Sequence, residues 1–279
     1  MRAPRRLAAG RSRGLVTLAL TSPDQERLLA RFQTPEITHL DIHLSRLGEA
    51  HDGWRIVHLT DLHHSRFTPI EEVERAVELA NRLRPDLVAL TGDYVTLSPA
   101  CIAPVARALG RLDARRGVFA VLGNHDFQVG AEAMTRALER QGIAMLRNRH
   151  HALHVGRARL WLVGVDDLWW QADDFRRAFR HLPLADPKIL LCHNPLGIRP
   201  ALRHGADLVL SGHTHGGQVR LPFFGRIYGR FRLGERFVEG WNQLEKTQIY
   251  VNRGIGKVVV PWRVACPPEI ACLRLRRAA

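Results

Sequence analysis

The chain has 279 residues, of which 46% are hydrophobic and 24% charged, so it can bury a large core and is not a disordered chain. Its net charge of +14, carried mainly by arginine, favours polyanionic neighbours such as nucleic acid, anionic lipid or phosphorylated substrates, although an arginine- and alanine-rich genome would give the same balance without a functional cause. The four cysteines form no C-x-x-C pair, which argues against a disulfide framework or a cysteine-based zinc site.

The first part of the chain is predicted to be a basic N-terminal tail over residues 1–34, followed by one domain over 35–279. No apolar run reaches the roughly 18–20 residues that a membrane span requires. A short apolar stretch at 15–20 follows the basic start without a convincing cleavage site, so a frayed arm is favoured over a degenerate export signal. We expect a cytoplasmic protein that contacts the inner membrane at most peripherally, with export as the open alternative.

The predicted strands come first in the domain. Residues 37–44 alternate, with Leu40, Ile42 and Leu44 on one face, which predicts a strand with one wet side. Short apolar runs follow that are typical of strands buried on both faces. Each run ends in polar residues, at positions 61, 93, 124–126, 166–167, 193–194 and 213–215.

Helical segments lie between these runs, and the alternation predicts an α/β fold. The segment 68–85 begins with a capping box of Thr68 and Glu71, and 130–142 is a second helix. A third, 194–205, has Asn194 as N-cap, with Pro200 predicted to kink or split it. Three further strands without intervening helices, at 248–256, 257–269 and 270–276, predict an antiparallel-rich C-terminal end.

Ligand-type side chains gather at the carboxyl ends of the predicted strands, which is the edge where open α/β sheets bind ligands. Carboxylate, imidazole and amide donors without thiolates suit Mn, Fe or Zn. In an extended segment residues two apart point the same way, so Asp61 and His63 can serve one ion, as can the His213–His215 pair. A single histidine after a strand is usually a structural residue, but five strand ends in order predict a metal site. The set is Asp61, His63, Asp93, Asn124, His125, His193, His213 and His215.

Five short motifs resemble the signatures of the calcineurin-like metallophosphoesterases. They are "DLH" at 61–63, "GD" at 92–93, "GNHD" at 123–126, the histidine of "CHNP" at 193 and "GHTH" at 212–215. The resemblance implies a single-domain, four-layer α/β/β/α sandwich. The stretches "SGHTHGGQVRLP", "VNRGIG" and "CPPEI" further resemble bacterial envelope-associated phosphodiesterases, including the UDP-2,3-diacylglucosamine pyrophosphatases of lipid A biosynthesis.

The resemblance implies two divalent metal ions, with manganese as the preferred metal, that share Asp93 as a bridging ligand. The first ion would be held by Asp61, His63, Asp93 and His215, and the second by Asp93, Asn124, His193 and His213. A water between the ions, with its pKa lowered toward ~7, would attack phosphorus in line. His125 would stabilise the transition state or protonate the leaving oxygen, and Asp126 would orient His125.

One departure from the wider superfamily concerns the substrate. The phosphoprotein phosphatases carry "GDYVDRG" and "GNHE", whereas this chain has "GDYVTLS" and "GNHD". The arginine that grips a phosphomonoester in those enzymes is therefore missing. A phosphodiester or pyrophosphate substrate is favoured over a phosphoprotein.

Two stretches are candidates for substrate contact. Trp169 and Trp170 follow a predicted strand at the active edge, and 221–237 mixes aromatic residues with arginines. The mixture suits an amphiphile with an anionic head, such as UDP-2,3-diacylglucosamine, or an anionic membrane surface. It also suits nucleic acid, so the alternative function is a nucleic-acid-directed phosphodiesterase or a basic nucleic-acid-binding protein. The stretch 221–237 can also be a packed hairpin with no role in binding. The sequence makes no prediction of oligomeric state.

The remaining polar residues are interpreted as structural. His58 is predicted to be a core residue and His64 an outer one, and residues 148–156 a polar hairpin rather than a second metal cluster. Asp166 and Asp167 are expected to be capping or supporting residues.

Overall fold

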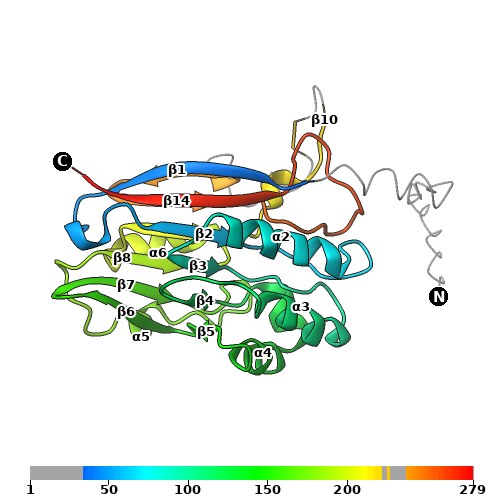
Figure 1. Cartoon of the computed structure of the whole chain (residues 1–279), viewed down its shortest axis with the longest axis horizontal. Helices are drawn as coiled ribbons and strands as arrows, with labels where there is room; N and C mark the ends of the chain where they lie inside the picture. Colours follow the sequence, from blue (N-terminus) through cyan, green and yellow to red (C-terminus); the bar gives the residue numbers. More distant parts are fainter. Residues whose placement is uncertain (1–33, 222–224, 227–236, 279) are drawn as a thin grey trace, which may run out of the picture. The chain divides into compact units, whose positions relative to one another are not determined.

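The computed structural model describes residues 34–221, 225–226 and 237–278, which form one α/β domain built on two six-stranded sheets (Figure 1). The predicted tail over 1–34 lies outside the described residues except for Thr34, as does most of the aromatic and arginine-rich stretch 221–237.

In the first sheet, the strand that comes last along the chain lies between the two that come first. The order of its strands is β1 (Glu36–Leu44), β14 (Glu269–Arg277), β2 (Arg55–Leu59), β3 (Leu87–Leu90), β4 (Val118–Ala120) and β5 (Ala144–Met145). Strand β14 is parallel to β1, beside which it lies in Figure 1, and antiparallel to β2. The predicted wet face of β1 is confirmed, because Ile42 and Leu44 are buried while Asp41 and His43 are exposed.

The second sheet is parallel in the middle and antiparallel at both edges. Its order is β12 (Gly240–Leu244), β13 (Thr247–Val251), β9 (Leu208–Ser211), β8 (Lys188–Leu191), β7 (Ala158–Gly164) and β6 (Arg149–Val155). The residues 148–156, predicted as a polar hairpin, contain only its first strand, β6, which pairs with β7. A short separate ladder joins β10 (Arg220–Leu221) to β11 (Gly225–Arg226).

Helices cover the outer face of each sheet, which confirms the four-layer α/β/β/α sandwich. Val57 and Val88 pack outward under α2 (Ile70–Arg82), α3 (Ile102–Leu109) and α4 (Asn124–Glu139). The alternate residues Ile56 and Ala89 pack between the sheets. The second sheet is covered by α5 (Phe175–Ala178) and α6 (Ile198–Arg203). Single 3-10 turns are η1 (Glu49–His51), η2 (Pro99–Cys101), η3 (Pro195–Gly197) and η4 (His215–Gly217).

The start of α2 differs from the sequence prediction. The helix begins at Ile70 behind Pro69, and no side chain caps it. The hydroxyl of Thr68 instead accepts a hydrogen bond from the Lys257 amide, at 3.1 Å. The predicted capping box is therefore wrong, because a contact with a segment far along the chain takes the capping oxygen.

The predicted strand over 257–269 is also wrong. Residues 257–268 form bends and irregular backbone, and their single β-bridge joins Val264 to Val219. The Gln218 side-chain amide donates to three carbonyls of this segment, at 2.9–3.2 Å, so these carbonyls are not free to form a ladder.

The other two predicted helices differ from the prediction in their bounds: one begins earlier than predicted, and the other is divided in two. Helix α4 begins at Asn124, ahead of the predicted start, with a kink at Gly130. The predicted helix over 194–205 divides into η3 and α6 between residues 197 and 198, ahead of Pro200. The Asn194 cap is confirmed, because its side chain accepts from the Leu196 amide.

Candidate metal centre

The predicted ligands lie directly after strands of both sheets. Strands β2, β3 and β4 of the first sheet are followed by Asp61, Asp93 and Asn124, while β8 and β9 of the second are followed by His193 and the His213–His215 pair. Hydrogen-bond and ion-pair contacts connect these side chains to one another across the two sheets. The carboxyl edges of the two sheets thus build one site, as the sequence predicted.

The backbone at this edge is in an uncommon conformation. Five of the seven predicted ligands have positive φ, between 47° and 71°. Residues other than glycine rarely adopt this region, and such strain gathers at functional sites. The expectation that Asp61 and His63, and likewise His213 and His215, lie in extended segments is wrong, because the chain turns at each of these residues. The five ligands with positive φ are Asp61, His63, Asp93, His213 and His215.

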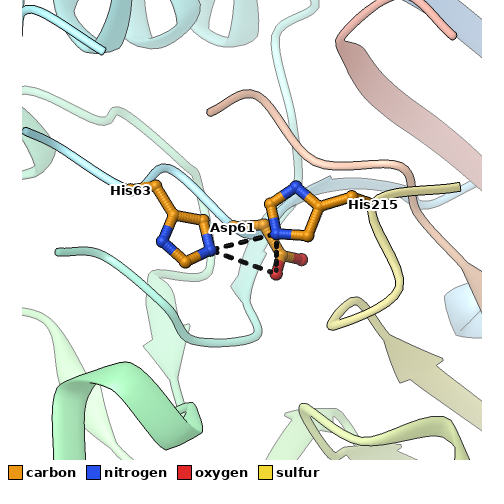
Figure 2. A group of neighbouring side chains, drawn as sticks. All are labelled: Asp61, His63 and His215. Carbon is orange, nitrogen blue, oxygen red and sulfur yellow. Dashed lines mark hydrogen bonds and ion pairs between the residues drawn. The ribbon is translucent and has the colours of Figure 1, made fainter. Parts of the chain in front are cut away.

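The first group of donors consists of Asp61, His63 and His215, all buried (Figure 2). The Nε2 atom of His215 lies 3.3 Å from Asp61 Oδ1 and 3.0 Å from His63 Nε2. His63 Nε2 is 3.8 Å from the same Asp61 oxygen. Three donor atoms therefore converge from two loops of the chain, one after β2 and one after β9.

The second group consists of Asp93, His193 and His213. His193 Nε2 lies 3.2 Å from Asp93 Oδ2 and 3.2 Å from His213 Nδ1. The amide oxygen of Asn124 is also 3.2 Å from His193 Nε2. All of the seven predicted ligands are thus brought together, with His213 and His215 in different groups.

Asp93 connects the two groups. Its Oδ2 lies 3.4 Å from His63 Nε2 in the first group and 3.2 Å from His193 Nε2 in the second. Its Oδ1 accepts a hydrogen bond from the His125 amide, at 2.8 Å. The backbone therefore fixes one oxygen of this carboxylate and leaves the other between the two groups.

Backbone carbonyls orient two of the histidine rings. His193 Nδ1 donates to the Thr91 carbonyl at 2.7 Å, which turns its Nε2 toward Asp93. His125 Nδ1 donates to the Thr96 carbonyl at 3.0 Å. The Thr96 hydroxyl also lies 3.2 Å from Nδ1 of His63. Such outer hydrogen bonds set the tautomer and orientation of metal-binding histidines.

The protonation states of Asp61 and His213 in the protein alone suit cation binding, whereas that of His193 does not. Burial raises the pKa of Asp61, but His215 and His63 outweigh burial and hold it well below its usual range. Burial, reinforced by His193, lowers the pKa of His213 to about 4. Burial alone would lower the pKa of His193, but the Asp93 carboxylate raises it to about 10. Ionised carboxylates and a neutral His213 are the metal-binding forms, and metal binding at His193 must release its proton.

Two glycines allow the close packing around the carboxylates. A Cβ on Gly212 would lie 2.1 Å from Asp61 Oδ2, and one on Gly123 would lie 2.2 Å from Asp93 Oδ1. Both distances are far below contact, so only glycine fits at either position. The glycines of the "GHTH" and "GNHD" motifs are therefore required by the carboxylates of the "DLH" and "GD" motifs.

Asp126 does not orient the His125 ring, contrary to the sequence prediction. Its Oδ2 accepts hydrogen bonds from the amides of Asp93, at 2.8 Å, and Gly123, at 2.9 Å. Its Oδ1 accepts from the Tyr94 amide at 2.9 Å. The Asp126 carboxylate thus holds the loop after β3 against the start of α4. The His125 ring is held by the Thr96 carbonyl instead of by Asp126.

Sequence reasoning missed Arg263, a buried residue of the segment 257–268. Its Nε donates to the Gly256 carbonyl at 2.9 Å, and its Nη2 lies 3.2 Å from Nδ1 of His215. The "VNRGIG" stretch offered a signal, because Gly254 and Gly256 pack directly against the Asp61–His63 turn.

A third donor group joins His125 to His63 and Asp93, and none of the three groups includes a residue interpreted as structural. His58 is buried, with Nε2 2.7 Å from the Thr91 hydroxyl. Asp166 forms an ion pair with Arg147. Within the part of the chain that the structure describes, no donor group includes His64 or a histidine of the β6–β7 hairpin. Arg220, which directly precedes the aromatic and arginine-rich stretch 221–237, forms an ion pair with Glu239.

The family model of the calcineurin-like phosphoesterases matches residues 55–217, and the chain belongs to this family. It is thus a metal-dependent phosphoester hydrolase, and the clustered donors are consistent with divalent metal ions. None of the helices in the described part of the chain is long and apolar enough to span a bilayer.

Among its relatives is the uncharacterized metallophosphoesterase YkuE of Bacillus subtilis, which is 31% identical over 88% of each chain. The phosphodiesterase YaeI of Escherichia coli is 34% identical over 80% of this chain and 82% of its own length. The crystal structure of TT1561 of Thermus thermophilus has the same fold, with a TM-score of 0.50 and 14% identity over 73% of this chain and 90% of that one.

Proposed function

We propose that the chain is a dinuclear metal-dependent phosphodiesterase or pyrophosphatase with Asp93 as the bridging ligand. The observation that carries the proposal is the position of Asp93 Oδ2, which lies 3.4 Å from a donor of one group and 3.2 Å from a donor of the other. Two neighbouring cations repel each other, and a shared carboxylate oxygen offsets that repulsion.

The donors divide between two ions in this proposal. One ion binds Asp61, His63, Asp93 and His215, and the other binds Asp93, Asn124, His193 and His213. The mixture of oxygen and nitrogen donors suits Mn, Fe or Zn, of which manganese is our preferred metal. When bound, the ions neutralise charge on the phosphoryl oxygens and activate a water for attack on phosphorus.

His125 is the candidate to contact the leaving oxygen. Its Nδ1 is held by the Thr96 carbonyl, at 3.0 Å, which leaves Nε2 for the substrate. Burial lowers the pKa of His125. A phosphoryl anion beside the ring favours the charged form and so opposes that effect. Asp126 acts on the reaction as a positioning residue, through the amides of Asp93 and Gly123.

The substrate proposed is a phosphodiester or pyrophosphate, either lipid-linked or a nucleotide sugar of the UDP-2,3-diacylglucosamine kind. The missing phosphomonoester-binding arginine and the name of the phosphodiesterase relative support the diester, and the envelope-type motifs support the lipid. On this view the protein is cytoplasmic and contacts anionic membrane peripherally. The net charge of +14 supports the second candidate, a phosphodiesterase directed at nucleic acid.

The first test compares two aryl esters with manganese present. Wild type is expected to hydrolyse bis(4-nitrophenyl) phosphate faster than 4-nitrophenyl phosphate, and Asp93→Ala to lose both this activity and bound metal, as measured by mass spectrometry of the metal content. Hydrolysis of neither ester, or a fully active Asp93→Ala, contradicts the proposal.

The second test separates the substrate classes. Hydrolysis of UDP-2,3-diacylglucosamine is compared with hydrolysis of an oligonucleotide at several salt concentrations. Turnover of the oligonucleotide alone, with an affinity that falls steeply as salt rises, supports the nucleic-acid-directed enzyme.

A further inference from the structure

Two tryptophans lie beside the second donor group. Trp169 and Trp170, in the loop between β7 and α5, are 54% and 51% exposed. The Trp169 ring centroid is 6.2 Å from that of His213, and Trp170 Nε1 donates to the Asn124 carbonyl at 3.0 Å. His213 and Asn124 are both proposed ligands of one ion, so these half-exposed indoles border the place where the phosphoryl group binds.

The loop that carries the tryptophans is fastened at both ends by Asn148. The Asn148 side-chain oxygen accepts hydrogen bonds from the amides of Asp166, at 3.0 Å, and Asp174, at 2.9 Å. Its nitrogen donates to the Ala172 carbonyl at 2.8 Å. The loop is therefore held in place before any substrate arrives, which reduces the entropy lost on binding.

Trp170 is supported from behind as well. Its ring is stacked on Phe127, at a centroid distance of 6.5 Å and an interplanar angle of 18°, and the Arg147 guanidinium lies over the same Phe127 ring. Within the loop, the Trp170 amide donates to the buried Asp167 carboxylate at 3.1 Å. These contacts fix one face of the indole and leave about half of the side chain exposed.

We propose that Trp169 and Trp170 form an aromatic shelf that binds a planar ring in one ester group of the substrate. This inference rests on the proposed function and makes it more specific, because it selects diesters and pyrophosphates that carry a nucleobase or an aryl group. The ring stacks on an indole while the phosphoryl group occupies the adjacent metal centre.

A planar ring fits the shelf better than an acyl chain does. Stacking on one face is enough to bind a ring, and one base on one aromatic side chain contributes roughly 1–3 kcal/mol. An acyl chain gains most when apolar surface surrounds it. Each tryptophan here is about half exposed to solvent, as a shelf requires and an enclosed tunnel does not.

The test measures binding of matched phosphates and phosphonates to the manganese-loaded protein by calorimetry. Uridine 5′-monophosphate is compared with ribose 5-phosphate, which lacks only the base, and benzylphosphonate with cyclohexylmethylphosphonate, which has the same carbon count but no flat ring. Octylphosphonate represents an acyl chain. The variants are Trp169→Leu, Trp169→Phe and, as a matched control, Trp241→Leu, which removes a half-exposed tryptophan on β12.

Wild type is expected to bind the flat member of at least one pair about fivefold or more tightly, which corresponds to ~1 kcal/mol of stacking. Trp169→Leu brings this ratio close to one, Trp169→Phe keeps most of it, and Trp241→Leu keeps all of it. The pair that shows the preference tells a nucleobase from a simple aryl group.

Equal binding within both pairs by wild type, or an unchanged ratio in Trp169→Leu, overturns the shelf. If octylphosphonate binds most tightly and Trp169→Leu abolishes that binding, the group that the two tryptophans bind is an acyl chain and not a planar ring. If the binding ratio depends on Trp169 but no diester is hydrolysed, the shelf is supported and the proposed phosphodiesterase function is contradicted. Thermal unfolding of each variant identifies any that fails to fold.

Discussion

The part of the chain that the structure describes has two histidine-rich regions, of which one gathers metal-type donors and the other does not. At the edge after β2, β3, β8 and β9, His63, His193 and His215 are buried, and their ring nitrogens lie close to carboxylates. On the β6–β7 hairpin, His151 and His154 are exposed, and Nδ1 of the partly buried His150 is bound to the Ala178 carbonyl.

The difference lies in the backbone. Adjacent residues of a strand point to opposite faces, so His150 and His151 diverge. At the other region the chain turns through positive φ at His63, His213 and His215, and these turns direct the rings toward the carboxylates. The number of histidines in a stretch therefore says less about a metal site than the turns that carry them.

The largest expected effect comes from exchanging one histidine in each region. His193→Gln removes a donor 3.2 Å from the Asp93 carboxylate oxygen, and we expect kcat/KM for a diester to fall about a thousandfold, since a metal contributes several kcal/mol of charge stabilisation. His150→Gln should change it less than twofold. Steady-state kinetics and metal content check both variants, and similar losses in the two would remove the distinction between the regions.

A second effect tests the close packing around Asp61. Gly212→Ala places a Cβ 2.1 Å from Asp61 Oδ2, so we expect about a hundredfold loss of activity and roughly 1–3 kcal/mol of stability from overpacking. Gly48→Ala is the control, because its Cβ meets nothing closer than 3.5 Å. Kinetics and chemical denaturation measure the two effects, and a fully active Gly212→Ala would show that the carboxylate is free to move.

A third prediction concerns pH and the buried His58. Burial lowers its pKa to about 4 from a reference of 6.5. His58 is therefore protonated below pH 6.5 in the unfolded chain, but only below about pH 4 in the folded protein. Stability is therefore lost as the pH falls through this window, by about 2 kcal/mol between pH 7 and pH 5.

Replacing His58 by asparagine should remove that part of the pH dependence, whereas His154→Asn on the hairpin should leave it in place. Denaturant unfolding at the two pH values gives the comparison. Equal slopes for wild type and His58→Asn would mean that other groups take up the protons.

The smallest effect is expected at Thr96, whose hydroxyl lies 3.2 Å from Nδ1 of His63. Thr96→Val should weaken metal binding about tenfold, the lower end for outer hydrogen bonds to metal-binding histidines, and Thr96→Ser should restore it. Competition with a chelator gives the affinity. Unchanged binding in Thr96→Val would assign the orientation of His63 to packing alone.

The sequence predicted the positions of the donors better than the groups that hold them. Polar side chains at successive strand ends are visible in the motifs, and the structure brings all of the seven predicted ligands together. The Thr91 and Thr96 carbonyls that orient His193 and His125 have no such signal, because every residue has a carbonyl.

Local signals failed where distant segments compete for the same atoms. The Thr68 hydroxyl accepts from Lys257 rather than capping α2, and the Gln218 side chain takes carbonyls that a strand over 257–269 would need. The sequence pairs Asp126 with the neighbouring His125, but its carboxylate accepts hydrogen bonds from amides of the loop after β3. Each error comes from a partner far along the chain, which local pattern reading does not detect.

The place of β14 between β1 and β2 has a consequence for biosynthesis. Of the strands that the structure describes, the last along the chain, Glu269–Arg277, provides the hydrogen-bond partner for both of the first two. The first sheet therefore cannot close before Glu269–Arg277 has been synthesised, and until then β2, which leads into Asp61, lacks its neighbour on one side. Such long-range pairing slows folding and leaves the nascent chain dependent on protection from aggregation.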